Sequence, residues 1–275
     1  FLGPAYDETL RAVYTQVTPR DIATPRSLLA ALTSDAIADN QPLFSLISKH
    51  FPPELLARIT QEYRKGRLLL IGTTNLDARR PVVWNMGAIA EAAANNPQAV
   101  ELFRRILLAS AAIPGEFPPV MFDVEVDGQP YQEMHVDGGA MRQLFLYPAN
   151  LREAAQHEHI KIFAQRLRRA YLIRNARLDP DWAVVERKTL TIAGHAISAL
   201  IETQGIGDLY QLYLLAQRDR LDFNLAYIGA DFNAEHKEDF DPAYMRTLFD
   251  YGYQLGKKGY PWQKAPPGLT ADENP

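Results

Sequence analysis

The sequence contains no cysteine among its 275 residues. This absence excludes disulfide bonds, thiolate metal sites and a cysteine nucleophile. No apolar stretch approaches the ~18 residues that a helix needs to cross a bilayer. Basic runs are short, as at Arg79–Arg80, and the formal net charge is -4. This balance argues against nucleic-acid binding, because a phosphate backbone is normally met by clustered Lys and Arg.

The composition is that of an ordinary globular protein. Hydrophobic residues make up 47% of the chain and charged residues 23%, which are typical values. A chain of this length can build one large α/β domain. We predict a single domain over residues 1–263, followed by a flexible tail at 264–275, because the tail is rich in Pro, Gly and acidic residues.

Helical and extended patterns alternate in the first half of the chain. A helix is predicted to begin at Pro52–Pro53 and to end at Gly66, and an apolar run at 67–71 predicts a buried strand. The polar residues Thr73–Asn75 are expected to turn that strand. A second helix is predicted to begin at Asn96–Pro97, where asparagine supplies the N-cap and proline the first helical position.

A β-hairpin is predicted around Asp127–Gly128, between extended segments at 119–126 and 131–137. The hairpin would place Asp137 at the end of its second strand. Gly138 and Gly139 follow directly and allow a tight turn with close backbone approach. An acid fixed in this way can be a catalytic carboxylate, although D-G is also a common pair in ordinary turns.

The second half of the chain alternates in the same way. The pattern predicts a helix over 150–168, strands at 170–173 and 223–228, and helices that begin near Asp208 and at Asp241–Pro242. Gly205-Ile206-Gly207 is expected to form the turn before the Asp208 helix rather than a nucleotide site, because the further glycine and downstream acid are missing. Strands that alternate with helices predict an α/β fold with a mostly parallel sheet.

Two motifs carry a resemblance to a known family. The segment S-A-A-I-P-G-E-F-P-P-V at 110–120, followed by D-G-G at 137–139, resembles the C-terminal part of the patatin-like phospholipases. The resemblance implies a three-layer α/β sandwich in which helices enclose a central, mostly parallel sheet. It also implies a serine acyl hydrolase that uses a Ser–Asp dyad without a metal or organic cofactor, with Asp137 as the dyad acid.

The nucleophile of that family is missing from this sequence. No G-x-S-x-G occurs in the chain, and no glycine-rich oxyanion loop precedes Gly66. We therefore expect an N-terminally incomplete patatin-like domain that supplies the aspartate but not the serine, and that is inactive by itself. Its expected partners are a lipid or other acyl-ester substrate and the missing N-terminal segment. The resemblance also implies a location in the bacterial cell envelope or secretion.

The resemblance assigns further residues to the site. Asp137 should be partly desolvated, which raises its proton affinity. Gly138 and Gly139 would support it as a turn. Thr73, Thr74, Asn75 and Asp77 resemble a segment found at this place in patatin-like relatives, and we expect them to form a turn and support the wall of the site.

Several other interpretations remain open. His135 lies two residues before Asp137 on the same strand face, so it is either a relay partner or a histidine bonded to a backbone carbonyl. Ser110 is a possible substitute nucleophile, although a helix C-terminus opposes an alkoxide. His157-Glu158-His159 has spacing unsuited to a metal site on a helix. The whole chain could instead be a non-catalytic lipid- or protein-binding module with a degenerate patatin fold, or an α/β domain with unrelated chemistry.

Overall fold

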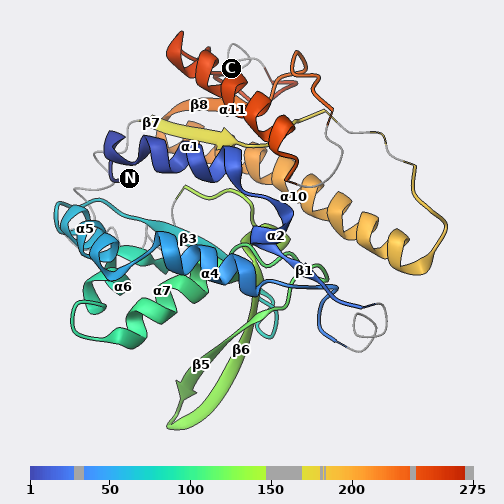
Figure 1. Ribbon diagram of the computed structural model, residues 1–275. Helices are drawn as coiled ribbons and strands as arrows, with labels where there is room; N and C mark the ends of the chain where they lie inside the picture. The colour runs from blue at the N-terminus through green and yellow to red at the C-terminus, as the bar shows by residue number, and fades with distance from the viewer. Residues whose placement is uncertain (28–33, 147–168, 180–181, 183, 236–239, 270–275) are drawn as a thin grey trace. The chain divides into compact units, whose positions relative to one another are not determined.

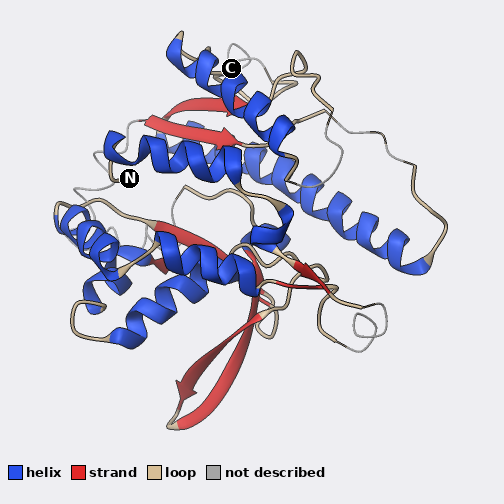
Figure 2. Ribbon diagram, viewed as in Figure 1, coloured by secondary structure: helices blue, strands red, loops and turns tan. Residues whose placement is uncertain are grey.

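The structure is a computed structural model that describes residues 1–27, 34–146, 169–179, 182, 184–235 and 240–269. The chain forms two compact units, traced in Figure 1. Unit 1 comprises Phe1–Arg142 and His236–Arg246, and unit 2 comprises Gln143–Glu235 and Thr247–Pro275. Both contain helices and strands (Figure 2), so the predicted α/β class is confirmed as a mixed α/β architecture. The single domain over 1–263 stays a prediction, since two compact units can belong to one domain.

A four-stranded sheet forms the centre of unit 1. Its strands are β3 (Leu70–Asn75), β4 (Arg80–Asn85), β5 (Val120–Val126) and β6 (Gln129–Asp137), in the order β4-β3-β6-β5. Each neighbouring pair is antiparallel. The prediction of a mostly parallel sheet is therefore wrong for this unit. For the pairs β3–β4 and β5–β6 the reason is local, because connections as short as 76–79 and Asp127–Gly128 can join only antiparallel neighbours.

The predicted hairpin between β5 and β6 is confirmed. Asp127 and Gly128 adopt φ values of 52° and 76°, which are the left-handed conformations that a two-residue hairpin turn requires. Figure 1 shows the hairpin tip extending away from the helices of unit 1. The base of the hairpin is buried and its tip is exposed, so the strand end that carries Asp137 is also the end that packs into the unit.

Helices pack against the sheet of unit 1 around a buried apolar core. Among its described residues, the unit contains the helices α1 (Asp7–Gln16), α2 (Pro19–Ile22), α4 (Gln41–His50), α5 (Pro53–Arg64), α6 (Met86–Ala92) and α7 (Pro97–Ala109), with the 3-10 turn η1 (Pro4–Tyr6) and the short strands β1 (Thr24–Pro25) and β2 (Ala38–Asp39). The core includes Leu56, Ile59, Met86, Phe103, Ile106 and Phe122. The predicted helix after Pro52–Pro53 is confirmed as α5, and Gly66 follows it with φ 90°.

The N-cap of α7 gives a first testable prediction. Asn96 Oδ1 accepts a hydrogen bond from the backbone N–H of Gln98 at 3.0 Å. Asn96→Ala removes this acceptor, and we expect it to lower the free energy of unfolding by about 1 kcal/mol. Chemical denaturation measures the change. Asn96→Ser keeps a capping oxygen and serves as the control, so equal losses for alanine and serine would contradict the capping role.

Unit 2 contains a parallel strand pair. β7 (Arg169–Arg174) pairs in parallel with β8 (Asp222–Tyr227), and α10 (Thr189–Asp219) lies between them in the sequence. The buried faces of these three elements share residues that include Ala170, Leu172, Leu209, Leu212, Phe223 and Leu225. The predicted strands at 170–173 and 223–228 are thus confirmed to within a few residues, whereas the helix over 150–168 and His157-Glu158-His159 lie outside the described residues.

Two details of the second half differ from the prediction. Asp208 and Gly205-Ile206-Gly207 lie inside α10 and neither caps nor precedes it. Asp208 is 1% exposed, and its Oδ2 accepts the backbone N–H of Gln143 at 2.6 Å. Gly205 packs closely against the ends of the Gln143 and Arg174 side chains, which would have to shift to admit a Cβ.

The end of the described chain is better anchored than predicted. α11 (Pro242–Lys257) begins after Asp241, whose Oδ1 accepts the N–H of Ala243 at 2.8 Å, as predicted for an N-cap. Within the predicted tail, Lys264 Nζ donates to Asp222 Oδ1 at 2.7 Å and Tyr210 donates to the carbonyl of Pro267. Residues 264–269 are therefore held by contacts within unit 2, and 270–275 lie outside the described residues.

Candidate active site

Asp137 occupies the junction where β6 ends and a glycine turn begins. Its backbone N–H donates to the carbonyl of Ala112 at 2.8 Å, and in the sheet it stands opposite Thr73 of β3. The backbone is therefore fixed from one side by the segment after α7 and from the other by β3. The predicted position at the end of the second hairpin strand is confirmed.

The carboxylate of Asp137 is half-buried and has little hydrogen-bond support. Its Oδ1 accepts the backbone N–H of Gly139 at 2.6 Å. Burial raises the pKa of the carboxyl above its usual value, and the Gly139 hydrogen bond opposes this shift only in part. A desolvated carboxylate with few donors holds a proton more strongly than a solvated one, as a general base must.

Gly138 and Gly139 have separate roles in the turn after Asp137. Both belong to the 3-10 turn η2 (Gly138–Ala140). A Cβ on Gly138 would lie 2.7 Å from the carbonyl oxygen of Gly72, so only glycine fits against β3 there. Gly139 supplies the N–H that binds Asp137. The close backbone approach expected from D-G-G is present.

The motif at 110–120 joins β3 and the end of β6 to α7. The Ser110 hydroxyl donates to the carbonyl of Gly72 at 2.8 Å, and the carbonyl of Ala112 receives the N–H of Asp137. Gly115 adopts φ 84° in the turn that follows, and Phe117 is buried. The motif thus aligns the backbone around Asp137. The Ser110 proton is bound to a carbonyl rather than to a carboxylate, which disfavours Ser110 as a nucleophile.

Thr73, Thr74 and Asn75 do not form the predicted turn. They are the last residues of β3 and are 0%, 1% and 0% exposed. The turn lies at 76–79, where Asn75 Oδ1 accepts the N–H of Ala78 at 2.9 Å. The side-chain oxygens of these buried residues have partners in the sheet or in the adjoining turns, whereas Asn75 Nδ2 is buried without a hydrogen-bond partner.

These residues support the Asp137 junction to different degrees. Thr73 faces Asp137 in the strand register, and the Thr74 hydroxyl donates to the carbonyl of Gly138 at 3.4 Å. Asp77 is exposed, and its Oδ2 accepts the N–H of Met134 at 2.7 Å, which holds the 76–79 turn against β6. The structure brings Thr73 and Thr74 to the junction, whereas Asn75 and Asp77 shape the adjoining turn. A role as a substrate-contacting wall stays a prediction.

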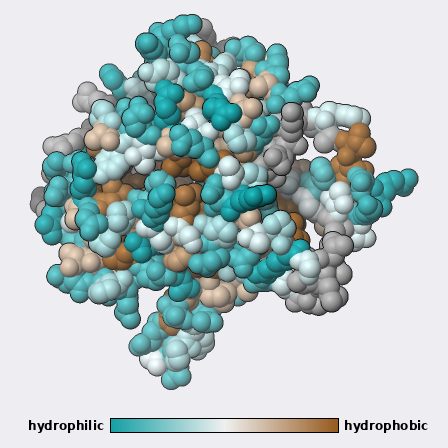
Figure 3. All heavy atoms as spheres, viewed as in Figure 1, coloured by the Kyte–Doolittle hydropathy of each residue, from teal (hydrophilic) through white to brown (hydrophobic). Residues whose placement is uncertain are grey.

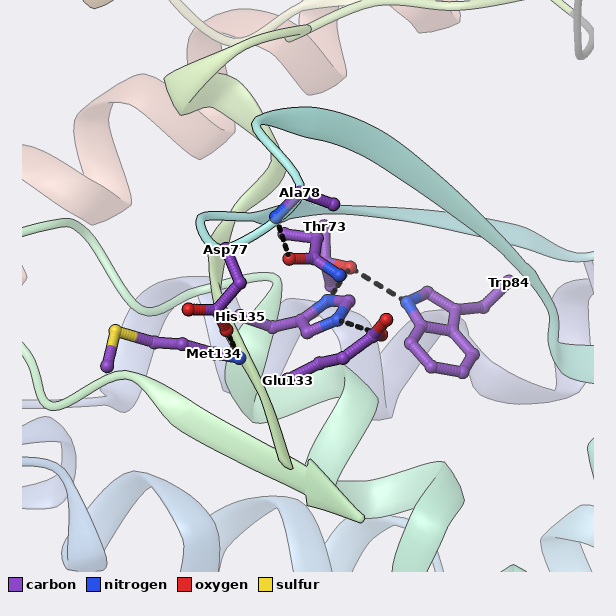
Figure 4. Close-up of polar contacts among 8 residues, drawn as sticks. Thr73, Asp77, Ala78, Trp84, Glu133, Met134 and His135 are labelled. Atoms are coloured by element: carbon purple, nitrogen blue, oxygen red, sulfur yellow. Dashed lines mark hydrogen bonds and ion pairs between the residues drawn. The ribbon is translucent and has the colours of Figure 1, made fainter. Parts of the chain in front are cut away.

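His135 lies in a polar network inside the sheet, shown in Figure 4. The residue is 0% exposed. Its Nδ1 lies 2.8 Å from Thr73 Oγ1, and its Nε2 lies 3.3 Å from Glu133 Oε2. The Thr73 oxygen also receives the indole N–H of Trp84 at 2.8 Å. Neither sequence interpretation of His135 matches these contacts, since its partners are a hydroxyl and a carboxylate rather than Asp137 or a backbone carbonyl.

Sequence reasoning missed Trp84 and Glu133 as members of this network. The available signal was the alternation of Glu133, His135 and Asp137, which places three polar side chains on one face of β6. Trp84 could not be found in this way, because its contact with Thr73 depends on the register between β3 and β4.

Among the residues that the structure describes, no group of three or more His, Cys, Asp or Glu side chains is placed to hold a metal ion. Within the same residues, no helix combines the length and apolarity needed to cross a membrane.

On the face drawn in Figure 3, hydrophilic residues predominate, with smaller hydrophobic groups between them.

Comparison with known proteins assigns no family to this chain. No protein-family model matches it, and a search of curated proteins gives no match. The patatin-like resemblance therefore rests on the sequence motifs at 110–120 and 137–139 alone and stays a prediction.

Proposed function

We propose that this chain is the acid-bearing part of a serine acyl hydrolase that acts on phospholipids or related acyl esters. The observation that supports the proposal is the state of Asp137. Its backbone is fixed by Ala112, its pKa is raised by burial, and among the described residues Gly139 is the only one seen to donate a hydrogen bond to its carboxylate. These are the properties that a general base needs when no histidine stands between it and the nucleophile.

The proposed reaction has two steps. Asp137 takes the proton of a serine hydroxyl while the serine oxygen attacks the ester carbonyl. Collapse of the tetrahedral intermediate breaks the ester bond, and Asp137 returns the proton to the departing alcohol. A water molecule then gives a proton to Asp137 and attacks the acyl-enzyme, and the released serine oxygen regains that proton as the fatty acid leaves.

The proposal places the serine outside these 275 residues, because the sequence contains no G-x-S-x-G. Ser110 is not assigned this role, since its hydroxyl donates to Gly72.

The test is to purify the protein encoded by the full gene and incubate it with a fluorophosphonate, which labels activated serines. We expect hydrolysis of a p-nitrophenyl ester and one labelled serine, located by peptide mass spectrometry outside the present sequence. Labelling at Ser110 would overturn the placement of the nucleophile. Binding of phospholipid vesicles with neither labelling nor hydrolysis would favour the alternative of a non-catalytic lipid-binding module.

A further inference from the structure

The hydroxyl of Thr73 is placed to influence Asp137. Thr73 and Asp137 are opposed in the antiparallel register of β3 and β6, which places both side chains on the same face of the sheet. Opposed Cβ atoms lie about 4.5–5.5 Å apart, within the reach of a hydroxyl that donates to a carboxylate. The contacts of Thr73 are instead with Trp84 and His135. The direction in which Thr73 donates its proton therefore matters for Asp137.

The contacts around His135 favour one arrangement of its ring proton. We assign the proton of the neutral ring to Nε2, because Nε2 faces Glu133 Oε2 and an ionised carboxylate accepts hydrogen bonds but does not donate them. With that tautomer Nδ1 is an acceptor, and Thr73 is the donor in the 2.8 Å contact with it. The opposite tautomer would leave Nε2 and the Glu133 oxygen facing each other as two acceptors.

Trp84 occupies part of the remaining hydrogen-bonding capacity of the Thr73 hydroxyl. An indole nitrogen can only donate, so its 2.8 Å contact occupies one lone pair of Thr73 Oγ1. The single Thr73 proton is already given to His135. Thr73 consequently has no proton left for Asp137, although it is the residue opposite.

We propose that Trp84, His135 and Glu133 hold the Thr73 proton away from Asp137, so that the carboxylate gains no second donor and remains an effective base. This inference rests on the proposed function, in which Asp137 takes a proton from serine. A hydrogen bond to the charged form of a carboxylate stabilises that form and weakens it as a base. Thr73 and His135 are thus positioning residues that act on Asp137 without touching substrate.

The test follows the titration of the Asp137 carboxyl carbon by NMR in the substrate-free protein. In His135→Phe the Thr73 proton loses its acceptor and turns to Asp137, so the titration should shift to lower pH. The double variant His135→Phe with Thr73→Val lacks the hydroxyl and should titrate as the wild type does. His135→Asn places an amide oxygen near the position of Nδ1 and is the matched control, with little expected shift.

A second variant covers the case in which phenylalanine is not tolerated in the core. The Glu133 side chain is 31% exposed, so Glu133→Ala should fold. Without the carboxylate, the His135 ring proton can move to Nδ1, which releases the Thr73 proton to Asp137 and again lowers the titration pH. Adding Thr73→Val should reverse that shift, whereas a purely electrostatic effect of the lost charge would persist.

An unshifted titration in folded His135→Phe and Glu133→Ala would overturn the inference, as would a shift in either variant that adding Thr73→Val does not reverse. Thermal unfolding of each variant establishes that it is folded. The titration needs no turnover, so its result is independent of the labelling experiment. A protein that shows the expected shifts but hydrolyses no ester would overturn the proposed function and leave the hydrogen-bond assignment standing.

Discussion

Asp137→Asn in the full-length protein is expected to lower kcat by about 10²- to 10⁴-fold, the range that general acid–base catalysis contributes. The amide has nearly the shape of the carboxylate, and its oxygen can still accept the N–H of Gly139. What it loses is the ability to take a proton. Ester hydrolysis under substrate saturation measures the effect. Activity within tenfold of the wild type would exclude Asp137 as the base.

The stability of Asp137→Asn shows whether a loss of activity reflects lost chemistry or a lost fold. Because burial raises the pKa of Asp137, the folded state binds more protons than the unfolded chain in the pH range between the two pKa values. The contribution of Asp137 to stability is therefore fully present below the unfolded-chain pKa and is lost as pH rises through the folded pKa. We expect the variant to gain stability relative to the wild type between acid and neutral pH. Thermal unfolding of the variant and the wild type, at an acidic and at a neutral pH, checks the direction of this change in stability.

Gly138→Ala is expected to destabilise unit 1 by about 2–3 kcal/mol, near the upper range for overpacking a closely packed site. The new Cβ would lie 2.7 Å from the carbonyl oxygen of Gly72 and 2.9 Å from its carbon. Backbone atoms cannot move aside as the end of a flexible side chain can. The strand end that carries Asp137 would have to separate from β3, so activity should fall together with stability.

Gly207→Ala is the matched control for Gly138→Ala. Gly207 lies inside α10, and a Cβ there meets nothing within 4 Å. Alanine is a better helix former than glycine, so this variant should be as stable as the wild type or up to about 1 kcal/mol more stable. Denaturant unfolding compares the two variants. If Gly138→Ala matched Gly207→Ala, the close approach of Gly138 to Gly72 would be refuted.

Local signals in the sequence predicted local structure well. The Asp127–Gly128 turn and the caps at Asn96 and Asp241 form as expected, because each depends on residues within a few positions along the chain. The position of Asp137 at the strand end follows from the same hairpin. Its hydrogen bond to Gly139, two residues away, is equally local.

Features that depend on distant residues could not be predicted. The sheet was expected to be mostly parallel because strand and helix patterns alternate. The antiparallel pairing of β3 with β6 is instead decided by tertiary contacts, which no local sequence pattern indicates. Thr73–Asn75 suggested a turn because they are polar, and their burial depends on partners such as His135, 62 positions away from Thr73. Asp208 suggested a cap for the same reason, whereas it binds Gln143, 65 positions away.

The Asp137 junction also has a consequence for how this site arises during folding. Its hydrogen bonds join Ser110 to Gly72, 38 positions apart, and His135 to Thr73, 62 positions apart. Closing such long loops costs chain entropy before any contact compensates for it, and structures rich in distant contacts fold slowly. The β5–β6 hairpin is closed by a local turn and would be marginally stable at best by itself, and within an isolated hairpin Asp137 would be an ordinary solvated acid. The burial that raises the pKa of Asp137 is reached only when β3 and the segment after α7 have docked, so this raised proton affinity coincides with completion of the fold of unit 1.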